Sequence, residues 1–290
     1  MELQSYEKTG YLHDDFKIFH LMDDHMPDVG FHYHDFHKIL LFRQGAVSYH
    51  VEGRTYDLLP DDIVFVPAGA VHRPVLHDST TPYERIIIYI SRHFLDAYRD
   101  DSCDLSLCLN EAHEKKSHVL RLPAFASSNL TRIIHELEQS FDSTQYASTL
   151  FQRLLFLELM VQLNRAALSD NIEYLSTPSS SGKMVHVIDY LNAHLTDDIT
   201  IDFLADHFYL SRYHLMHSFK EATGYTIGNY LTTKRLLLAR EQILQGEAIT
   251  TVCYACGFHN YSTFSRAYRK HFGCSPREQL ELPQISPSHP

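Results

Sequence analysis

Three histidines near the start of the chain have a spacing that suits a ligand-binding cluster. His32 and His34 stand two positions apart in a His-Tyr-His run, and His72 closes the pattern Pro67-x-Gly69-x-x-His72. Imidazole nitrogens that converge with a carboxylate can bind zinc, iron, nickel or manganese. The same nitrogens can instead bind an organic molecule in an apolar cavity that has a few convergent polar groups. The candidate effector-binding residues are His32, His34, His72, Tyr33 and Arg73.

Residues 249–276, which read ITTVCYACGFHNYSTFSRAYRKHFGCSP, suggest a second chemistry, the recognition of DNA bases. They predict a short helix, a turn at residues 257–259, and a second helix that begins after Asn260 and ends at Gly273. Phe264 and Tyr268 recur at helical spacing and should be buried. Small and basic side chains then face outward, as in a helix that enters the DNA major groove. These outward residues are Ser262, Thr263 and Arg266.

A similar hairpin about 49 residues earlier makes the DNA interpretation specific. In the run LADHFYLSRYHLMHSFKEATG, Leu215 and Phe219 correspond to the two buried aromatic residues of the later copy. The outward residues of this first copy are Tyr213, Met216 and His217. Residues 228–245, between the copies, have no helix breaker and predict a helix about 27 Å long. Successive major-groove faces are about 34 Å apart, so one chain could place two recognition helices on DNA.

Basic residues beside these helices are expected to hold DNA phosphates, which position a protein without reading sequence. They are Arg212, Lys220, Arg269 and Lys270. Arg266, if it binds a guanine through two hydrogen bonds, would add about 1–3 kcal/mol of base discrimination. The net charge of −11 seems unsuited to DNA, but residues 207–277 hold nine basic and three acidic side chains, and residues 1–182 carry the whole net charge. We expect an acidic sensor joined to a basic DNA reader.

The elements that must position these residues differ between the two halves of the chain. Short apolar or alternating runs separated by turn residues predict strands at residues 38–42, 46–52, 63–66 and 85–90, and hence a small antiparallel barrel. From Ala126 to about Ser169 the pattern becomes helical, and its second helix is apolar on more than one face. A Ser/Pro/Gly-rich linker follows. The predicted fold is α+β, with a barrel at 1–125, a helical dimerisation segment at 126–170, a linker at 171–183 and a DNA-binding domain at 184–290.

The last hundred residues resemble the AraC/XylS family of bacterial transcription regulators, which carry two helix-turn-helix motifs. Matching positions are Leu204-Ala205, Ser211, Leu215, Phe219-Lys220, Gly224, Tyr230, Arg235, Ala239, Gly257-Phe258, Ser262, Phe264, Ser265-Arg266, Lys270, Gly273 and Ser275-Pro276. The histidine patterns resemble the two motifs of cupin barrels, which serve as the ligand-sensing half in many members of the family. One departure is His217, which stands where the family usually has Arg, so the first helix is expected to read fewer guanines.

The resemblance implies a sequence-specific DNA-binding regulator whose barrel senses a small molecule, a sugar in many relatives. It also implies a homodimer formed through the helices of residues 126–170. Activation is the more frequent mode in the family, and an activator would have RNA polymerase as a further partner.

An alternative interpretation is a metal-dependent cupin enzyme, or a metal sensor, that carries a DNA-binding tail. The metal ligands would then be His32, His34 and His72. In metal-binding cupins a Glu completes this set, but here the position holds Lys38, whose positive charge repels a metal ion. We therefore expect an organic effector, no metal or other cofactor, and no enzymatic activity.

The remaining features predict a cytoplasmic location. No apolar run follows a basic cluster at the N-terminus, and no stretch is long enough to span a bilayer. Five cysteines without a regular framework fit a reducing compartment. Cys253 and Cys256 have redox-like or zinc-like spacing, but their positions in a short helix favour a packing role.

Overall fold

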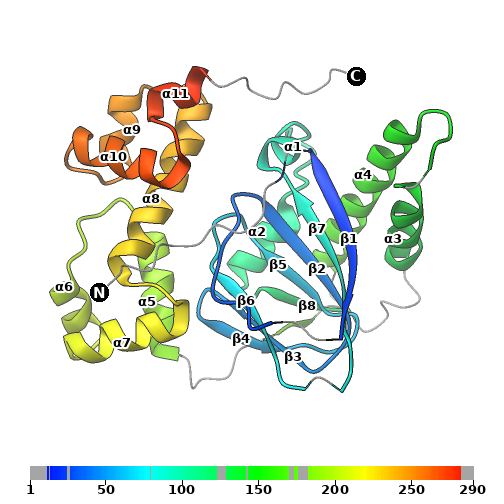
Figure 1. Ribbon diagram of the computed structural model, residues 1–290, viewed down its shortest axis with the longest axis horizontal. Coiled ribbons are helices and arrows are strands. Elements are labelled where there is room, and N and C mark those ends of the chain that lie inside the picture. The colour runs from blue at the N-terminus through cyan, green and yellow to red at the C-terminus, as the bar shows by residue number, and fades with distance from the viewer. Residues whose placement is uncertain are drawn as a thin grey trace. The chain divides into compact units, whose positions relative to one another are not determined.

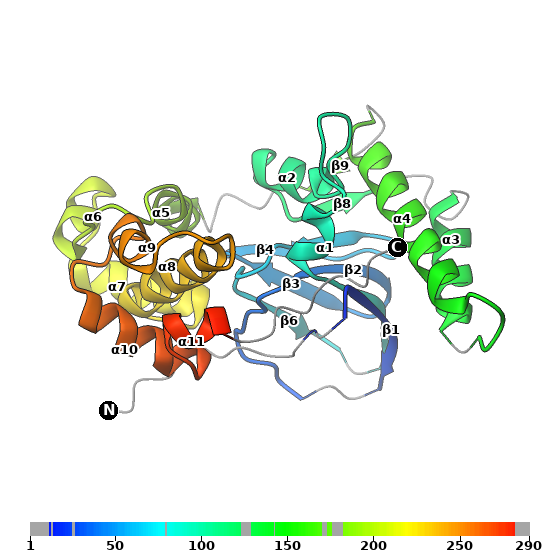
Figure 2. The ribbon, with the colours of Figure 1, turned by 90° about the horizontal axis from the view of Figure 1, so that it is seen from above.

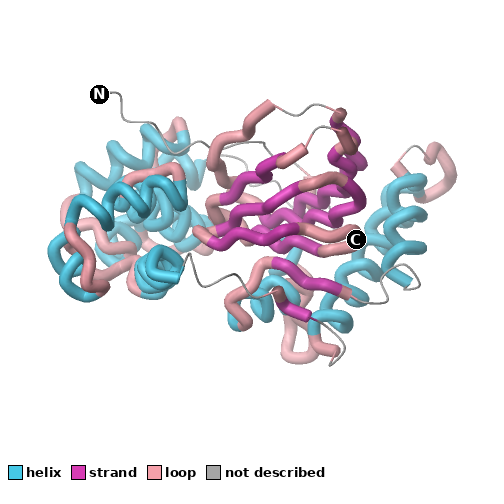
Figure 3. Tube along the Cα trace, turned by 90° about the horizontal axis from the view of Figure 1, so that it is seen from below, coloured by secondary structure: helices cyan, strands magenta, loops and turns pink. Residues whose placement is uncertain are grey.

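The computed structural model describes residues 12, 14–24, 27–78, 80–122, 129–141, 143–169, 173–175 and 182–281. The chain divides into two compact units between residues 181 and 182. Within the described residues, strands occur only in the first unit, and the second unit consists of helices and their connections (Figure 3). This is the α+β architecture expected from the sequence. None of the described helices is both long enough and apolar enough to cross a membrane.

Two antiparallel sheets form the first unit (Figure 1). Their strands are β1 (Phe16–Asp23), β2 (His37–Gln44), β3 (Val47–Val51), β4 (Arg54–Asp57), β5 (Ile63–Val66), β6 (His72–Leu76), β7 (Tyr83–Ile90), β8 (Val119–Arg121) and β9 (Glu173–Tyr174). The larger sheet has the order β1-β7-β2-β5-β8-β9, and the smaller sheet has the order β4-β3-β6. Buried side chains from both sheets form one hydrophobic cluster, so the sheets face each other.

The alternation of side chains along β2 explains why the chain folds in this way. Leu40 and Phe42 pack in the cluster between the two sheets, whereas Ile39 and Leu41 pack on the opposite face of the larger sheet. Both sets are almost fully buried, which accounts for the continuous apolar run in the sequence. By the same two-residue period, Lys38 lies on the inner face with Leu40 and Phe42. A lysine is therefore directed into the space between the sheets.

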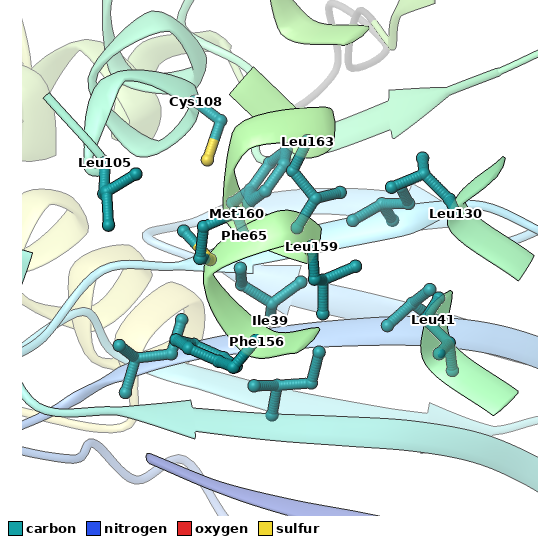
Figure 4. Close-up of a cluster of buried hydrophobic side chains, with 14 of the residues drawn as sticks. Ile39, Leu41, Phe65, Leu105, Cys108, Leu130, Phe156, Leu159, Met160 and Leu163 are labelled. Carbon is teal, nitrogen blue, oxygen red and sulfur yellow. The ribbon is translucent and has the colours of Figure 1, made fainter. Parts of the chain in front are cut away.

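Helices cover the outer face of the larger sheet (Figure 2). They are α1 (Arg92–Asp96), α2 (Leu107–Glu114), α3 (Asn129–Ser140) and α4 (Ser148–Ala167). Phe156, Leu159 and Met160 of α4 are completely buried and lie over Ile39 and Phe65 of the sheet (Figure 4). Each such side chain stabilises the fold by about 1.5–3 kcal/mol relative to an exposed one.

Several parts of the first unit differ from the sequence prediction. The predicted strands appear as β2, β3, β5 and β7, and the two predicted helices appear as α3 and α4. Strands β1, β4, β6, β8 and β9 and helices α1 and α2 were not predicted. Part of the expected linker is also in regular structure, because Glu173–Tyr174 pairs with β8 and the next helix begins at Gly182. Residues 170–172 and 176–181 of the linker region lie outside the described residues.

The second unit contains the two predicted helical hairpins. Its helices are α5 (Gly182–Ala193), α6 (Ile201–His207), α7 (Arg212–Thr223), α8 (Ile227–Leu244), α9 (Ile249–Ala255), α10 (Tyr261–Phe272) and α11 (Pro276–Glu281). The Asn260 side chain accepts a hydrogen bond from the Thr263 amide, and Ser211 does the same for His214 at the start of α7. Both helices end at a left-handed glycine, Gly224 or Gly273. The predicted caps and stops are confirmed.

Arg235 of α8 ties the two hairpins together. Its guanidinium donates hydrogen bonds to three backbone carbonyls, those of Leu195, Asp197 and Gly257, at 2.6, 2.7 and 2.9 Å. Gly257 has φ +79°, and a Cβ built on it would lie 2.8 Å from the carbonyl oxygen of Thr196. The turn of the second hairpin therefore packs directly against the segment that precedes the first. Glycine is required there both for its backbone conformation and for this close approach.

Candidate effector site and nucleic-acid interface

The three histidines selected from the sequence meet between the two sheets. Their ring centroids are 4.4 Å apart for His32 and His72, 4.8 Å for His34 and His72, and 5.2 Å for His32 and His34. His32 and His72 exchange backbone hydrogen bonds of 2.9 and 3.1 Å, which aligns their side chains on one face. All three side chains are buried, and one nitrogen from each ring lies within 4.8 Å of the others.

Backbone carbonyls determine which ring nitrogen of two of these histidines carries the proton. Nδ1 of His32 lies 2.9 Å from the carbonyl oxygen of Gly30, and Nδ1 of His72 lies 2.9 Å from that of Ala70. A carbonyl oxygen only accepts, so each neutral imidazole must be protonated on Nδ1. Nε2 is then a hydrogen-bond acceptor in both rings. Nε2 of His72 is buried and has no hydrogen-bond partner among the described residues.

Burial and neighbouring charges keep His32 and His72 neutral. Burial lowers the pKa of His32 to about 4, and the charge of Lys38 acts in the same direction. Burial also lowers the pKa of His72 well below its ordinary value, with further contributions from Lys38, His32 and His34. Both imidazoles are therefore uncharged at neutral pH.

Lys38 of β2 is a charged residue on the inner face, close to the histidines. Its side chain is buried, and Nζ donates a hydrogen bond to the hydroxyl of Tyr49 on β3 at 2.9 Å. The Tyr49 ring in turn stacks on His72 with 6.1 Å between centroids. Burial lowers the pKa of Lys38 to about 7, and the positive charge of Arg85 adds to this effect. Lysine, tyrosine and histidines thus form one connected polar site.

The donor set does not fit a cupin-type metal centre. Three imidazoles converge, but a carboxylate is absent from the metal-binding group found among the described residues. Lys38 occupies the carboxylate position of the motif and faces the same space as the histidines, where it lowers the pKa of two of them. A divalent ion there would lie close to an ammonium group in a poorly solvated interior, which is strongly unfavourable. We therefore derive no chemistry through a metal.

The other two candidate effector residues are not brought into this cluster. Tyr33 is buried, but alternation along the extended segment directs its side chain away from His32 and His34. Arg73 follows His72 on β6 and so faces the outer side of the smaller sheet, where its guanidinium lies 4.3 Å from the ring centroid of Phe31. Tyr33 and Arg73 are next to the histidines in the sequence, but adjacent residues of an extended segment face opposite sides, so their side chains do not join the cluster.

Helix α10 presents the predicted outward residues of the second hairpin. Phe264 and Tyr268 are fully buried in a cluster with α8 and α9, whereas Ser262, Thr263 and Arg266 are exposed. The Arg266 side chain lies along its own helix, with Nε 3.3 Å from the carbonyl oxygen of Ser262. Cys253 and Cys256 are buried in the same cluster as free cysteines, as their packing interpretation requires.

Helix α7 of the first hairpin repeats this arrangement with different outward side chains. Leu215 and Phe219 are fully buried, and Tyr213, Met216 and His217 are exposed. The rings of Tyr213 and His217 stack with 5.8 Å between centroids. The exposed side chains of α7 are thus larger and more apolar than those of α10.

The four predicted phosphate-binding residues, Arg212, Lys220, Arg269 and Lys270, are all exposed. Two of them have acidic neighbours in the same unit. Arg212 lies 3.0 Å from Asp202 of α6, and Arg269 lies 2.7 Å from Glu278 of α11. Exposed ion pairs of this kind contribute about 0–1 kcal/mol, so a phosphate could displace either carboxylate.

Helix α4 has an exposed apolar face as well as a buried one. Leu150, Phe151 and Leu154 are 58, 52 and 56% exposed, next to the side chains that pack on the sheet. The sequence had predicted two packing surfaces for this helix, and the sheet accounts for one of them. Contiguous exposed apolar side chains on a folded protein often mark an interaction surface.

Comparisons with known proteins cover both units. The family described as AraC-like ligand binding domain matches residues 19–160, and the family described as helix-turn-helix domain matches residues 204–281. The chain is 26% identical over 260 residues to the HTH-type transcriptional activator RhaS of Shigella sonnei (strain Ss046), with 89% of this chain and 90% of that protein covered. RhaS of Escherichia coli (strain SMS-3-5 / SECEC) is 25% identical over the same length and coverage.

Two solved structures are among those similar to the chain. ToxT from Vibrio cholerae is 14% identical, with 92% of this chain and 98% of that chain covered and a TM-score of 0.36. A regulator with an AraC-type DNA-binding domain from Chromobacterium violaceum is 29% identical, with 37% and 98% covered and a TM-score of 0.33.

Proposed function

The chain belongs to the AraC/XylS family of transcription regulators and has a ligand-binding domain followed by a helix-turn-helix domain. We propose which of its residues bind the effector and which bind DNA. The barrel binds a small effector at the site formed by His32, His34, His72 and Lys38. Helices α7 and α10 read DNA bases, and the basic residues beside them hold phosphates. The observation that supports the DNA-binding roles most directly is the pair of capped helices, each with one buried face and one exposed face.

Arg266 is the residue to which we assign direct base recognition. It is exposed at the middle of α10, two turns from Asn260 at the helix start, on the side opposite Phe264 and Tyr268. An Arg side chain in the major groove can donate two hydrogen bonds to O6 and N7 of guanine. His217, at the corresponding position of α7, cannot make this paired contact. We therefore expect the second hairpin to determine more of the sequence preference.

The test is a binding-site selection from random double-stranded DNA with the full chain, followed by affinity measurements. Arg266→Ala should reduce discrimination at one base pair by about 5- to 150-fold, equivalent to about 1–3 kcal/mol. Arg99→Ala, which removes an exposed arginine from the barrel unit, is the matched control and should leave the preference intact. An equal loss of affinity for all sequences would show that Arg266 only holds phosphate. No selected sequence at all would contradict the regulator proposal.

Three further parts of the proposal concern partners and location. The chain forms a homodimer through the exposed face of α4, and it works in the cytoplasm, where its DNA lies. It acts as an activator, as the relatives named RhaS are, and so contacts RNA polymerase. The proposal assigns no enzymatic reaction to the chain, which is in keeping with the histidine cluster of the described residues, where no carboxylate joins the three imidazoles. A sugar or sugar derivative is the starting candidate for the effector.

A further inference from the structure

Lys38 is a buried cation without a counter-charge. Its side chain is 6% exposed, and the hydroxyl of Tyr49 is its hydrogen-bond acceptor. No carboxylate forms an ion pair with Lys38 among the described residues, and its pKa is lowered by burial and by Arg85 with no acidic group opposing them. Burying an ammonium group is expensive unless it is paired and hydrogen-bonded. An ammonium has three donors, so two of those on Lys38 remain available.

The ionisable groups near Lys38 do not neutralise its positive charge. Arg85 on β7 faces the same interior, but it is already paired with Asp23 and donates to the carbonyl of Tyr83. Tyr49 and Tyr83 are neutral at physiological pH, since burial raises their pKa values. His32 and His72 are also neutral, because burial lowers their pKa values. Below about pH 7 the site therefore carries a positive charge on Lys38, and no acidic side chain among the described residues forms an ion pair with it.

The neighbouring histidines contribute the opposite kind of hydrogen-bonding group. With Nδ1 of His32 and His72 donating to backbone carbonyls, each Nε2 is an acceptor. Nε2 of His72 is fully buried and unsatisfied among the described residues, which destabilises the empty site. A ligand hydroxyl could donate to it. An anion without hydroxyl groups could not.

We propose that the effector of this barrel is a small hydroxylated anion, either a sugar acid or a phosphorylated sugar, whose charged group pairs with Lys38 and whose hydroxyls donate to Nε2 of His72 and His32. This inference rests on the proposed effector site and specifies what it binds. The two binding features occur side by side, because Tyr49 contacts both Lys38 and His72. A neutral sugar would leave the charge of Lys38 unbalanced, and a metal ion would increase it.

The test uses small probes and thermal unfolding of the full chain at slightly acidic pH, where Lys38 is charged. Glycolate has a carboxylate and a hydroxyl, acetate has only the carboxylate, and ethylene glycol has only hydroxyls. Glycerol phosphate replaces the carboxylate by a phosphate, and sodium chloride equalises ionic strength. We expect glycolate, glycerol phosphate or both to raise the Tm of the barrel unit by about 2–4 °C. Acetate should raise it less, and ethylene glycol should leave it unchanged. Whichever of glycolate and glycerol phosphate is more effective identifies the anionic group.

Two variants assign the effect to the named residues. Lys38→Met should abolish the rise in Tm for every anion, whereas Lys17→Met, an exposed lysine of β1 in the same sheet, should retain it. His72→Phe should remove the advantage of glycolate over acetate and keep the acetate effect. The proposal is overturned if ethylene glycol stabilises as well as glycolate, if Lys38→Met keeps the response, if no anion raises the Tm, or if zinc chloride alone does so.

Sequence-specific DNA binding by the same samples separates this proposal from the regulator function. A wild-type chain that reads its selected DNA sequence but shows no anion response would contradict the effector class alone. A chain that responds to glycolate but has no DNA preference would contradict the DNA-reading role and support the effector class.

Discussion

At the scale of single residues, Lys38 gives the barrel an unusual dependence of stability on pH. Its pKa is about 7 in the folded chain, against about 10.4 in an unfolded chain. Between these values the unfolded state binds one more proton than the folded state, so stability rises with pH. Below about pH 7 both states are protonated, and the full unfavourable effect of the buried charge is present. The barrel should therefore be more stable at mildly alkaline pH than at neutral pH.

Calorimetry of the full chain without effector can measure this dependence. From pH 7 to pH 9, the free energy of unfolding of the barrel unit should increase by about 2 kcal/mol more in the wild type than in Lys38→Met. The comparison removes contributions from all other groups. Lys17→Met should behave like the wild type. Parallel pH profiles for the wild type and Lys38→Met would show that burial does not lower the pKa of Lys38, which would then stay protonated in the folded chain over this range.

The residues of this site could be predicted to different extents. The spacing of His32, His34 and His72 was sufficient to predict that they converge, and Lys38 was recognised as a cation at the carboxylate position. The tautomers depend on carbonyls two positions away in a particular backbone conformation, which no spacing rule specifies. Among the described residues Lys38 has no acidic partner, and this could not be predicted because the side chains around it come from several strands that are distant in the sequence. Long-range contacts of this kind are not encoded in a local pattern.

At the scale of elements, the turn at Gly257 couples the two hairpins and should be sensitive to a single methyl group. Gly257→Ala places a Cβ against the carbonyl oxygen of Thr196 and near the Arg235 guanidinium, at a φ of +79°. Gly273→Ala has nearly the same φ, +77°, but its Cβ would meet no atom within 4 Å. Both changes incur the strain of a left-handed residue, about 1–3 kcal/mol. Only the first also disrupts the contact between hairpins.

Hydrogen exchange of the full chain can distinguish these two variants. We expect Gly257→Ala to speed amide exchange in α9 and in residues 195–200, and to weaken binding to the selected DNA more than Gly273→Ala does. The expected difference follows from displacement of Arg235, which donates to carbonyls of both segments. Equal effects of the two substitutions would mean that the close contact between Gly257 and Thr196 does not contribute to the stability of the second unit.

The elements that sequence reasoning recovered are those with strong local signals. Helices α7 and α10 have a capping side chain at one end and a glycine at the other, and β2, β5 and β7 are nearly continuous apolar runs. Strand β1 was missed because none of its eight residues is buried, four being partly buried and four exposed, so its burial lacks a clear period. Strand β6 contains Arg73 and Pro74 and owes its conformation to pairing with β3. These elements depend on their neighbours rather than on their own residues.

At the scale of the whole molecule, the exposed face of α4 bears on how two chains associate. Leu150, Phe151 and Leu154 leave a large apolar area in water, while the other side of α4 is already packed on the sheet. A second chain that applied the same face would bury both copies at once, as a twofold interface requires. Two DNA-binding units per dimer would also double the number of recognition helices on one DNA.

Sedimentation velocity of the full chain tests this association. Leu154→Glu should weaken the dimer by about 3 kcal/mol or more, roughly 100-fold in Kd, because the substitution removes a buried Leu from each partner and buries a charge instead. Leu59→Glu is the matched control, since Leu59 is similarly exposed, at 52%, but lies in the connection before β5. Wild type and Leu59→Glu should sediment as dimers at concentrations where Leu154→Glu is a monomer. A wild-type chain that sediments as a monomer would exclude the dimer. A dimer that is unaffected by Leu154→Glu would show that the interface lies elsewhere. The isolated second unit keeps all the DNA-reading residues, so loss of the dimer should lower affinity for a two-site operator and leave affinity for a half-site unchanged.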